Sequence, residues 1–454
     1  MTIAAKDTNQ LSLSAWSHSK DLLKFSVPMT LTAASAVLTQ IIDSLMAGKL
    51  GIGHLAGIAL ASSTYFMAVI IGRGVSQGLS PLLAGTAARG DQVASEKLIS
   101  HSLLLQIIVG IVLTPFLYLV NHSLEFFGQA EDVATYARTY LNIMGIFLIP
   151  QFIMQVLRTC IESYGNSKFP MMASYGAAAL NIFLNWLLIF GNLGFPRMEL
   201  AGAALASGLS HTFLLVIFYM YLKNKYSIHP LAGFKDGFDK SSFSKLSKLG
   251  GIFAFQWFIE VGAFSGSTVI IALYSKTHLA AHQIVLNVAT LMFMIPLGLG
   301  AASTIKVSGA VSKYGKDKIL PIVKSYLLTC WVATIFTSIL ILICKDIVPS
   351  FYTNDLAVIS LAQSVLLIAA LFQFADGTQA VVSGILRGYM DIKTPTIVIT
   401  VCWWFITLPL GYFLSIQLQK GTQGMWYALT LGLFLAAALL TARLYKVAVK
   451  KVKV

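Results

Sequence analysis

The chain has 454 residues, of which 57% are hydrophobic and only 11% carry a charge. An average soluble protein has about 25% charged residues, and the mean hydropathy here is +0.77, so the soluble, disordered and fibrous classes are excluded. The formal net charge of +14 would suggest nucleic-acid binding in a soluble protein, so the positions of the charges must decide what it means.

Apolar stretches of a length that can cross a bilayer recur along the whole chain. A helix needs about 20 apolar residues to span the hydrocarbon core, and the period-two alternation of a membrane β-barrel is absent. The sequence therefore predicts an all-α integral membrane protein with twelve transmembrane helices. Nine stretches contain no Lys, Arg, Asp or Glu: 50–72, 98–124, 139–157, 169–196, 200–222, 277–305, 325–344, 394–419 and 421–442. Three contain a single acid: 25–48, 249–275 and 356–386.

Basic residues are distributed unevenly between the segments that join these spans. If the N-terminus is inside, the inner segments hold 24 Lys and Arg residues and the outer segments hold 5. Because cytoplasmic segments carry the excess of basic residues, this distribution predicts that both termini are cytoplasmic. The short tails favour a bacterial plasma (inner) membrane. The positive charge is then a topology signal, so we expect the lipid bilayer as a partner and no nucleic acid.

The longest polar stretch follows the sixth span and divides the chain near its middle. It predicts a cytoplasmic linker over 223–249 between an N-terminal lobe, 1–222, and a C-terminal lobe, 250–454. Three short motifs recur between the lobes at a nearly constant offset. They are His54-Leu55-Ala56 with His278-Leu279-Ala280, Gly90 with Gly315, and Lys168-Phe169-Pro170 with Lys393-Thr394-Pro395. Two similarly oriented six-helix lobes predict pseudo-symmetry about an axis along the membrane normal, with a central cavity between them.

Only three of the 18 acidic residues lie well inside spans, namely Asp43, Glu260 and Asp376. An ionised carboxylate at the bilayer centre costs about 2.5–3.5 kcal/mol on insertion scales. No Lys or Arg lies at comparable depth in any span. Each acid is therefore expected to face a water-filled cavity, to bind a cation or a proton, or to stay neutral in a packed interface.

The depths of the three acids differ between the lobes. At about 1.5 Å per residue, Glu260 and Asp376 lie about 15 and 16 Å from the cytoplasmic ends of their spans, near the middle of the membrane. This pair could share a monovalent cation such as Na⁺, because oxygen ligands suit hard cations, or it could share a proton. Asp43 belongs to the other lobe and lies nearer the outer side.

Polar side chains of the fifth and sixth spans could accompany Asp43. Asn181 and Asn185 are four residues apart and share one helical face, and Ser207 offers a further oxygen. Amides and hydroxyls inside spans also form helix–helix hydrogen bonds, so both roles remain open from the residues alone.

Aromatic and methionine side chains are plentiful near the acids of the second lobe. Aromatic rings attract organic cations, and methionine adapts to varied shapes, although the same side chains could face lipid. They are Phe255, Trp257, Phe258, Phe264, Met292, Phe293, Met294, Phe372 and Phe374.

Motifs of several other functional classes are missing from the sequence. The chain has no GxxxxGK[ST] motif for ATP, and no HExxH or GxSxG motif for hydrolysis. Its four cysteines show no paired spacing, which excludes a disulfide scaffold and a CxxC metal site. We therefore expect no enzyme and no bound cofactor, and an ion gradient as the source of energy.

Three separated motifs resemble those of the multidrug and toxin compound extrusion (MATE) transporters, in particular their NorM-like branch. The resemblance covers nearly the whole chain. Its motifs are Ile42–Gly48 in the first span, Phe258–Val261 with Ala280–Gln283 and Asn287 in the seventh and eighth spans, and Asp376 with Ser383–Tyr389 in the tenth.

This resemblance implies a secondary active antiporter that expels cationic lipophilic compounds in exchange for Na⁺ or H⁺. It implies that Glu260 and Asp376 bind the coupling cation, and that Asp43, with Asn181 and Asn185 near it, is the acid of the first lobe. The residues expected to contact drugs are Asp43, Gln283, Asn287, Phe258, Met292 and Phe372. Sodium-linked relatives can have Tyr where this chain has Phe372, so the choice between Na⁺ and H⁺ stays open.

Two other functional classes compete with an antiporter that acts as a monomer. A flippase for lipid-linked oligosaccharide would carry a pyrophosphate, for which buried Lys or Arg would be expected, whereas this chain buries acids. A channel usually assembles from repeated short subunits with a filter loop, and the sequence shows none.

Overall fold

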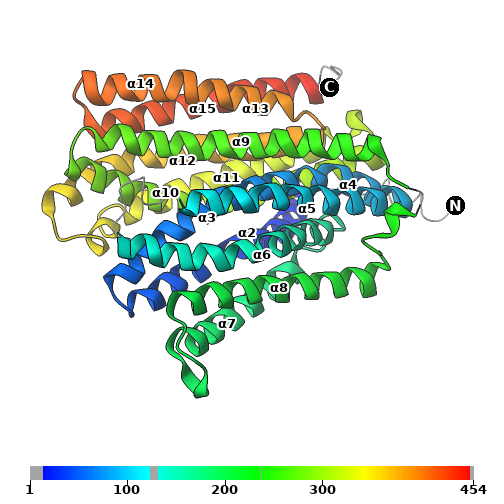
Figure 1. Ribbon diagram of the computed structural model, residues 1–454. Helices are drawn as coiled ribbons and strands as arrows, with labels where there is room; N and C mark the ends of the chain where they lie inside the picture. The colour runs from blue at the N-terminus through cyan, green and yellow to red at the C-terminus, as the bar shows by residue number, and fades with distance from the viewer. Residues whose placement is uncertain (1–13, 123–130, 236, 450–454) are drawn as a thin grey trace. The chain divides into compact units, whose positions relative to one another are not determined.

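The computed structural model describes residues 14–122, 131–235 and 237–449. Within these ranges every regular element is a helix, and twelve helices are long and apolar enough to cross a membrane. The predicted all-α class and the twelve spans are therefore confirmed (Figure 1).

Six spans precede the polar stretch in the middle of the chain, and six follow it. The first six are α2 (Ala15–Gly48), α3 (Ile52–Gln77) continued by α4 (Leu79–Arg89), α5 (Gln92–His122), α6 (Glu131–Ser163), α7 (Lys168–Phe190) and α8 (Glu199–Tyr226). The next four are α9 (Lys240–Ala272), α10 (Lys276–Tyr314), α11 (Leu320–Cys344) and α12 (Leu356–Gly388). The last two are α13 (Lys393–Thr400) continued by α14 (Leu408–Tyr412), and α15 (Gly421–Ala448).

The helices extend beyond the apolar stretches into their charged ends, because lysine favours helix and its ammonium group can reach the interface. α8 ends at Tyr226 and α9 begins at Lys240, so the predicted linker is helical at both of its ends. Asp239 caps α9, with one carboxylate oxygen 2.6 Å from the Ser242 hydroxyl and the other 2.9 Å from the Ser241 N–H. These bonds, that of Ser242 above all, lower the pKa of Asp239.

The chain packs into two compact units whose boundaries lie inside helices. The first unit is Leu31–Ala254, and the second joins the chain up to Thr30 with Phe255 and all that follows. The boundaries in α2 and α9 are separated by the same offset that relates His54 to His278 in the repeated motifs. The first helix of each half therefore contributes its opening turns to the unit that the other half forms.

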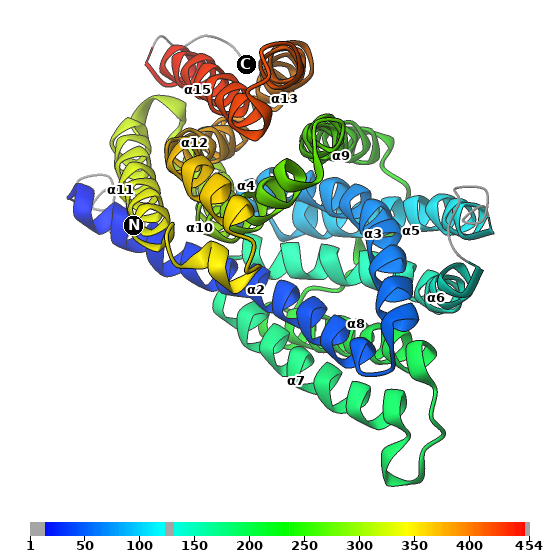
Figure 2. The same cartoon turned by 90° about the vertical axis from the view of Figure 1, so that its left-hand side faces the viewer.

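The first unit is built around α6, which packs against α3, α5 and α8, while α7 packs against α8 (Figure 2). The opening turns of α9 approach α3 through small residues. A carbon added at Gly74 would lie 2.4 Å from the Cα of Ala254, and one added at Gly78 would lie 2.6 Å from the N of Gly250. Small residues four apart on each helix are what allow two membrane helices to approach so closely.

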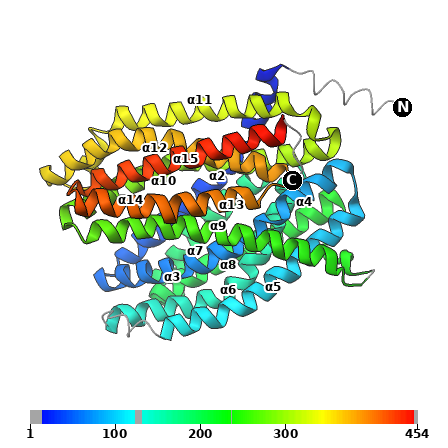
Figure 3. The same ribbon diagram turned by 90° about the horizontal axis from the view of Figure 1, so that it is seen from above.

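The second unit is built around α12, which packs against α10, α11 and α15 (Figure 3). The backbones of α12 and α10 meet closely at Gly384, where an added carbon would lie 2.2 Å from the carbonyl oxygen of Gly300. The eleventh span is irregular, with π-helical stretches at Val401–Thr407 and Phe413–Gln417 on either side of α14. Pro409 in α14 carries no N–H, which removes one hydrogen bond from this span.

Candidate functional site

Asp43 of α2 is the acid that lies well inside a span of the first unit, and its carboxylate is buried in a polar cluster. The Asn185 side-chain amide donates to its Oδ1 at 2.5 Å, and the Ser207 hydroxyl donates to its Oδ2 at 3.0 Å. Both carboxylate oxygens thus accept a hydrogen bond, which is the arrangement that stabilises an ionised group. The structure therefore brings Asp43 together with the polar residues of the fifth and sixth spans.

The amides of α7 connect this cluster into a chain. Asn181 and Asn185 lie one helical turn apart, and Asn185 donates to the Oδ1 of Asn181 at 3.0 Å. Asn181 donates in turn to the Ser207 hydroxyl at 3.2 Å. The Oδ1 of Asn185 is buried and accepts no hydrogen bond from the described residues. The cluster therefore contains one unused acceptor, Asn185 Oδ1, which could accept a hydrogen bond from a hydroxyl or a protonated carboxyl group, or bind a cation.

Two acids of the second unit lie well inside spans, and Glu260 of α9 is the better connected of them. Its Oε1 accepts from the Gln256 amide at 2.9 Å and from the Gln379 amide at 3.5 Å. The Gln256 side chain also accepts from the Thr396 hydroxyl at 3.2 Å, which ties α9 to α13. Arg387, at the end of α12, interacts electrostatically with Glu260.

Asp376 of α12 is buried and interacts electrostatically with Glu260, but no hydrogen bond reaches it from the described residues. Gln373, one turn earlier on α12, is fully buried, and neither atom of its amide has a partner in the described part of the chain. An ionised carboxylate without donors is strongly disfavoured in such surroundings. Asp376 therefore requires either a bound proton or a cation.

Arg387 corrects one premise of the sequence analysis. Counted along the helix, this arginine lies at the end of its span, which suggested that no basic side chain could accompany the acids. Its electrostatic interaction with Glu260 shows that a basic side chain does accompany one of the two acids.

Apart from Asp43, the residues expected to contact drugs lie in the second unit, where they fall into two groups. Gln283 and Asn287 of α10 and Phe258 of α9 are exposed, and Met292 is half-buried. Phe372 is buried, with its ring centroid 5.1 Å from Trp426 and 6.3 Å from Phe264. Phe372 thus belongs to an aromatic cluster rather than to an open surface.

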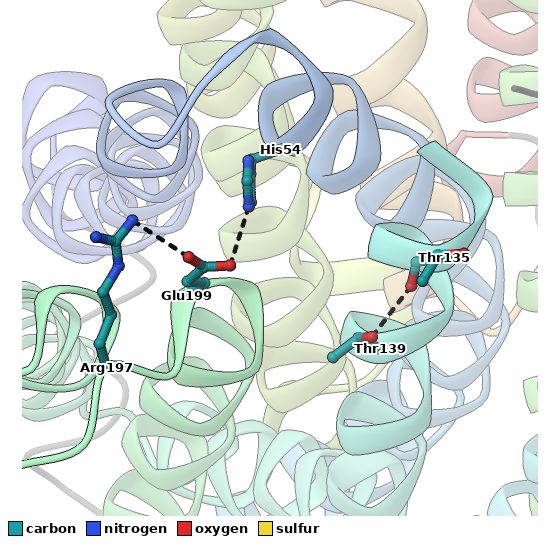
Figure 4. A network of polar contacts seen from close by, with 5 residues as sticks. All are labelled: His54, Thr135, Thr139, Arg197 and Glu199. Carbon is teal, nitrogen blue, oxygen red and sulfur yellow. Dashed lines mark hydrogen bonds and ion pairs between the residues drawn. The ribbon is translucent and has the colours of Figure 1, made fainter. Parts of the chain in front are cut away.

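A separate polar network lies at the start of α8 in the first unit. Glu199 accepts a hydrogen bond from His54 at 3.1 Å and forms an ion pair with Arg197 at 3.2 Å. Figure 4 shows His54 and Arg197 directed at the same carboxylate, with the Thr139-to-Thr135 bond of α6 beside them. This network joins the starts of α3 and α8.

Comparisons with known proteins decide the family. The MatE family model matches residues 28–187 and 253–413. A "Probable multidrug resistance protein NorM" of Bacillus anthracis is 31% identical and is aligned over 97% of both chains. A protein of the same name from Pasteurella multocida is 28% identical over 95% of this chain and 94% of its own. The chain belongs to the MatE family.

The fold of this MatE protein agrees with solved structures. One, described as the outward-facing conformation of a multidrug resistance MATE family transporter, aligns with a TM-score of 0.86. The two chains are 19% identical, and the alignment covers 96% of this chain and 97% of the other. The two stretches that match the family model begin at 28 and 253, which are related by the same offset as Gly90 and Gly315. MatE proteins are a family of transporters rather than of enzymes.

Sequence reasoning missed three polar side chains of the second centre. Gln256, Gln379 and Thr396 are ordinary uncharged residues, and nothing in their types marks them as partners of an acid. One signal was available, because Gln256 precedes Glu260 by four residues and therefore shares its helical face.

Proposed function

We propose that this MatE protein is a secondary active multidrug efflux antiporter, which expels cationic lipophilic compounds in exchange for Na⁺ or H⁺. The observation that carries the proposal is the presence of two separate buried carboxylate centres, one in each compact unit. The names of the relatives, which are probable multidrug resistance proteins, support the same function.

The pair Glu260 and Asp376 is the proposed coupling site. Asp376 has no hydrogen-bond donor within the described residues, and Glu260 is the acid that faces it. Two carboxylates in one apolar region repel each other unless a positive charge joins them. A proton or Na⁺ entering from one side supplies that charge, and its departure to the other side removes it. Carboxylate and amide oxygens suit both Na⁺ and a proton, so the chemistry of the donors fits either ion.

Asp43 is the proposed link between drug binding and protonation in the first unit. An ionised Asp43 accepts from Asn185 and Ser207, and it also attracts a cationic drug. A protonated Asp43 loses that attraction and can donate to the unused acceptor, Asn185 Oδ1. α2 is easier to bend at Pro28, which has no N–H, so the two protonation states would favour two packings of this helix.

The remaining features of the proposed transporter concern its setting. We place it in a bacterial plasma membrane as a monomer without a cofactor, with both termini cytoplasmic and lobes at 1–222 and 250–454. Cysteines introduced at 223–248 should react with an impermeant label only from the cytoplasmic side. Labelling of intact cells from outside would reverse this orientation.

Efflux from proteoliposomes under separately imposed Na⁺ and H⁺ gradients tests the function. A gradient of the coupling ion should drive loss of a cationic dye, and a gradient of the other ion should not. Stoichiometric exchange distinguishes an antiporter from a channel. If neither gradient moves the dye or any cationic drug, the proposed function is wrong.

A further inference from the structure

The segment between α8 and α9 is held against the start of α5 by hydrogen bonds. We call residues 227–235 and 237–239 the linker segment. Its backbone meets α5 so closely that a carbon added at Gly233 would lie 2.5 Å from the carbonyl oxygen of Glu96. The hydrogen bonds are Gln92 Nε2 to Ser227 O (3.3 Å), His229 N to Glu96 Oε1 (3.5 Å), Ser100 Oγ to Pro230 O (2.6 Å), Gly233 N to Ser100 Oγ (3.0 Å) and Asp239 N to His101 Nε2 (2.9 Å).

These contacts give the linker segment a depth in the membrane. Gln92 begins α5, and His101 follows nine residues later, which is about 14 Å along the helix. The uncharged apolar stretch of this span starts at Leu98, so His101 already lies inside it. The head-group region of a bilayer is only about 5–8 Å thick on each side. The linker segment therefore runs beside the first turns of a spanning helix, at the boundary between head groups and acyl chains.

The outward face of the linker segment carries large apolar side chains. Leu231 is 71% exposed, and Phe238 is 56% exposed although its ring centroid lies 5.2 Å from that of His101 and 5.3 Å from that of Phe243. In water such side chains would be unfavourable, whereas at the membrane interface they are the expected contacts with acyl chains. Because Ser100 and His101 hold the backbone, this apolar face is preformed.

Exposed lysines lie within the linker segment and on the adjoining turns of α8 and α9. The six are Lys223, Lys225, Lys235, Lys240, Lys245 and Lys248. None of these ammonium groups forms an ion pair with a carboxylate of the described residues. The described acid of the segment, Asp239, is occupied in capping α9. The charge of this surface is therefore left for an external anion.

We propose that the linker segment and its flanking lysines form a binding surface for the head groups of anionic phospholipids. Leu231 and Phe238 enter the boundary of the leaflet, and Lys235 and Lys240 contact lipid phosphates. Exposed apolar side chains next to lysines, at the depth of the interface, suit an anionic phospholipid. The apolar side chains contact its acyl chains and the lysines contact its phosphate. This inference is independent of which ion is coupled and of which compounds are transported.

A depth measurement on the full-length protein tests the proposal. A spin label at Leu231→Cys, with the four native cysteines replaced by serine, is placed in nanodiscs of phosphatidylcholine with or without phosphatidylglycerol. The label should be accessible to oxygen, which partitions into lipid, and shielded from a water-soluble nickel reagent. The proposal would be overturned if the nickel reagent reached the label equally well in nanodiscs with and without phosphatidylglycerol.

A second measurement is made on protein that keeps its native cysteines, so it does not depend on the cysteine-to-serine replacements. The preference of the purified protein for phosphatidylglycerol over phosphatidylcholine is measured by native mass spectrometry of retained lipid. Lys235→Gln with Lys240→Gln should weaken this preference by about fivefold for each lysine removed. The matched control is Lys276→Gln with Lys420→Gln, which removes two exposed lysines of the second unit and should leave the preference unchanged. Equal losses in both double variants, or none in the first, would contradict a dedicated surface.

Discussion

The two acid centres differ in how completely their hydrogen bonds are satisfied. In the first unit, both oxygens of Asp43 accept hydrogen bonds from side chains of neighbouring helices. In the second unit, Glu260 has two amide donors, whereas Asp376 has none among the described residues. The first centre thus offers donors to both oxygens of an ionised carboxylate, whereas the second offers none to Asp376 among the described residues. The difference suggests that the centres perform different steps rather than the same step twice.

The repeat explains the shared framework but not these centres. At the offset that relates His54 to His278, the position of Asp43 corresponds to Ser267. At the offset that relates Gly90 to Gly315, the position of Asp376 corresponds to Gln151, which accepts from the Tyr65 hydroxyl. By contrast, contacts at the helix ends recur in pairs, because His54 meets Glu199 in one unit and His278 meets Thr422 in the other. The two halves therefore share their helix packing, while their buried chemistry differs.

The largest effect is expected at the incomplete centre. Glu260→Gln and Asp376→Asn should each reduce ion-driven efflux to the level of empty vesicles, because each removes half of the shared charge. The double variant should be no worse than either single variant, since residues that act as a unit are not additive. Gradient-driven efflux measures this, with the amount of folded protein as the control. Losses that multiply would mean two independent sites.

A smaller effect is expected at the satisfied centre. Asp43→Asn keeps the shape but removes the charge, so affinity for a cationic drug should fall about tenfold, which is about 1.4 kcal/mol. The dependence of that affinity on pH should disappear as well. Binding to the purified variant over a pH series provides the measurement. An unchanged affinity with the wild-type pH profile would exclude this role for Asp43.

A third comparison concerns the turns before α7 and α13, where corresponding residues of the two halves form different side-chain hydrogen bonds. Asp391 pairs with Arg443 at 2.7 Å, whereas the corresponding Asn166 donates to the Tyr221 hydroxyl at 2.6 Å. Asp391→Asn should cost about 1.5–3 kcal/mol of unfolding free energy, because a buried charged bond is lost. Tyr221→Phe removes a neutral bond and should cost about 0.5–1.5 kcal/mol. Unfolding of both variants in one detergent ranks them, and the reverse order would contradict this account.

The smallest effect is expected at the start of α8. The Glu199 side chain is 40% exposed, so its pairing with His54 is screened by water and salt. His54→Ala should cost at most about 1 kcal/mol, and less as salt is added. His278→Ala removes the acceptor of the Thr422 N–H and should be insensitive to salt. Thermal unfolding at two salt concentrations separates the two, and the same salt dependence in both would argue against this distinction.

Much of the architecture could be predicted because hydrophobic length is a direct consequence of bilayer thickness. The twelve spans followed from uncharged stretches, and the repeat followed from three short motifs. The start of α9 at Lys240 could not be found in this way, since a lysine-rich segment has no apolar signal even when it is helical. The π-helical turns at Val401–Thr407, which pack against α15, were also not predicted, because no residue pattern marks them.

The candidate site could be predicted only for charged residues, because a charged group inside the membrane has a high free energy and is therefore rare. Carboxylates within spans stand out, and the spacing of Asn181 and Asn185 places them on one face. Which acid is fully hydrogen-bonded could not be read from the chain, since it depends on the positions of Ser207 and Gln256 on other turns and helices. Residue type identifies the charged groups, and only the packing assigns their donors.

The unit boundaries inside α2 and α9 have a consequence for how the protein is made. The first unit needs residues up to Ala254, so it is complete only after the opening turns of α9 have left the ribosome. The opening turns of α2 belong to the second unit and are synthesised before any of their partners beyond Phe255. These turns are therefore inserted first, and their partners follow only after the whole first unit has been inserted. Neither half of the gene therefore encodes a complete compact unit, because each unit includes the opening turns of a helix that the other half encodes.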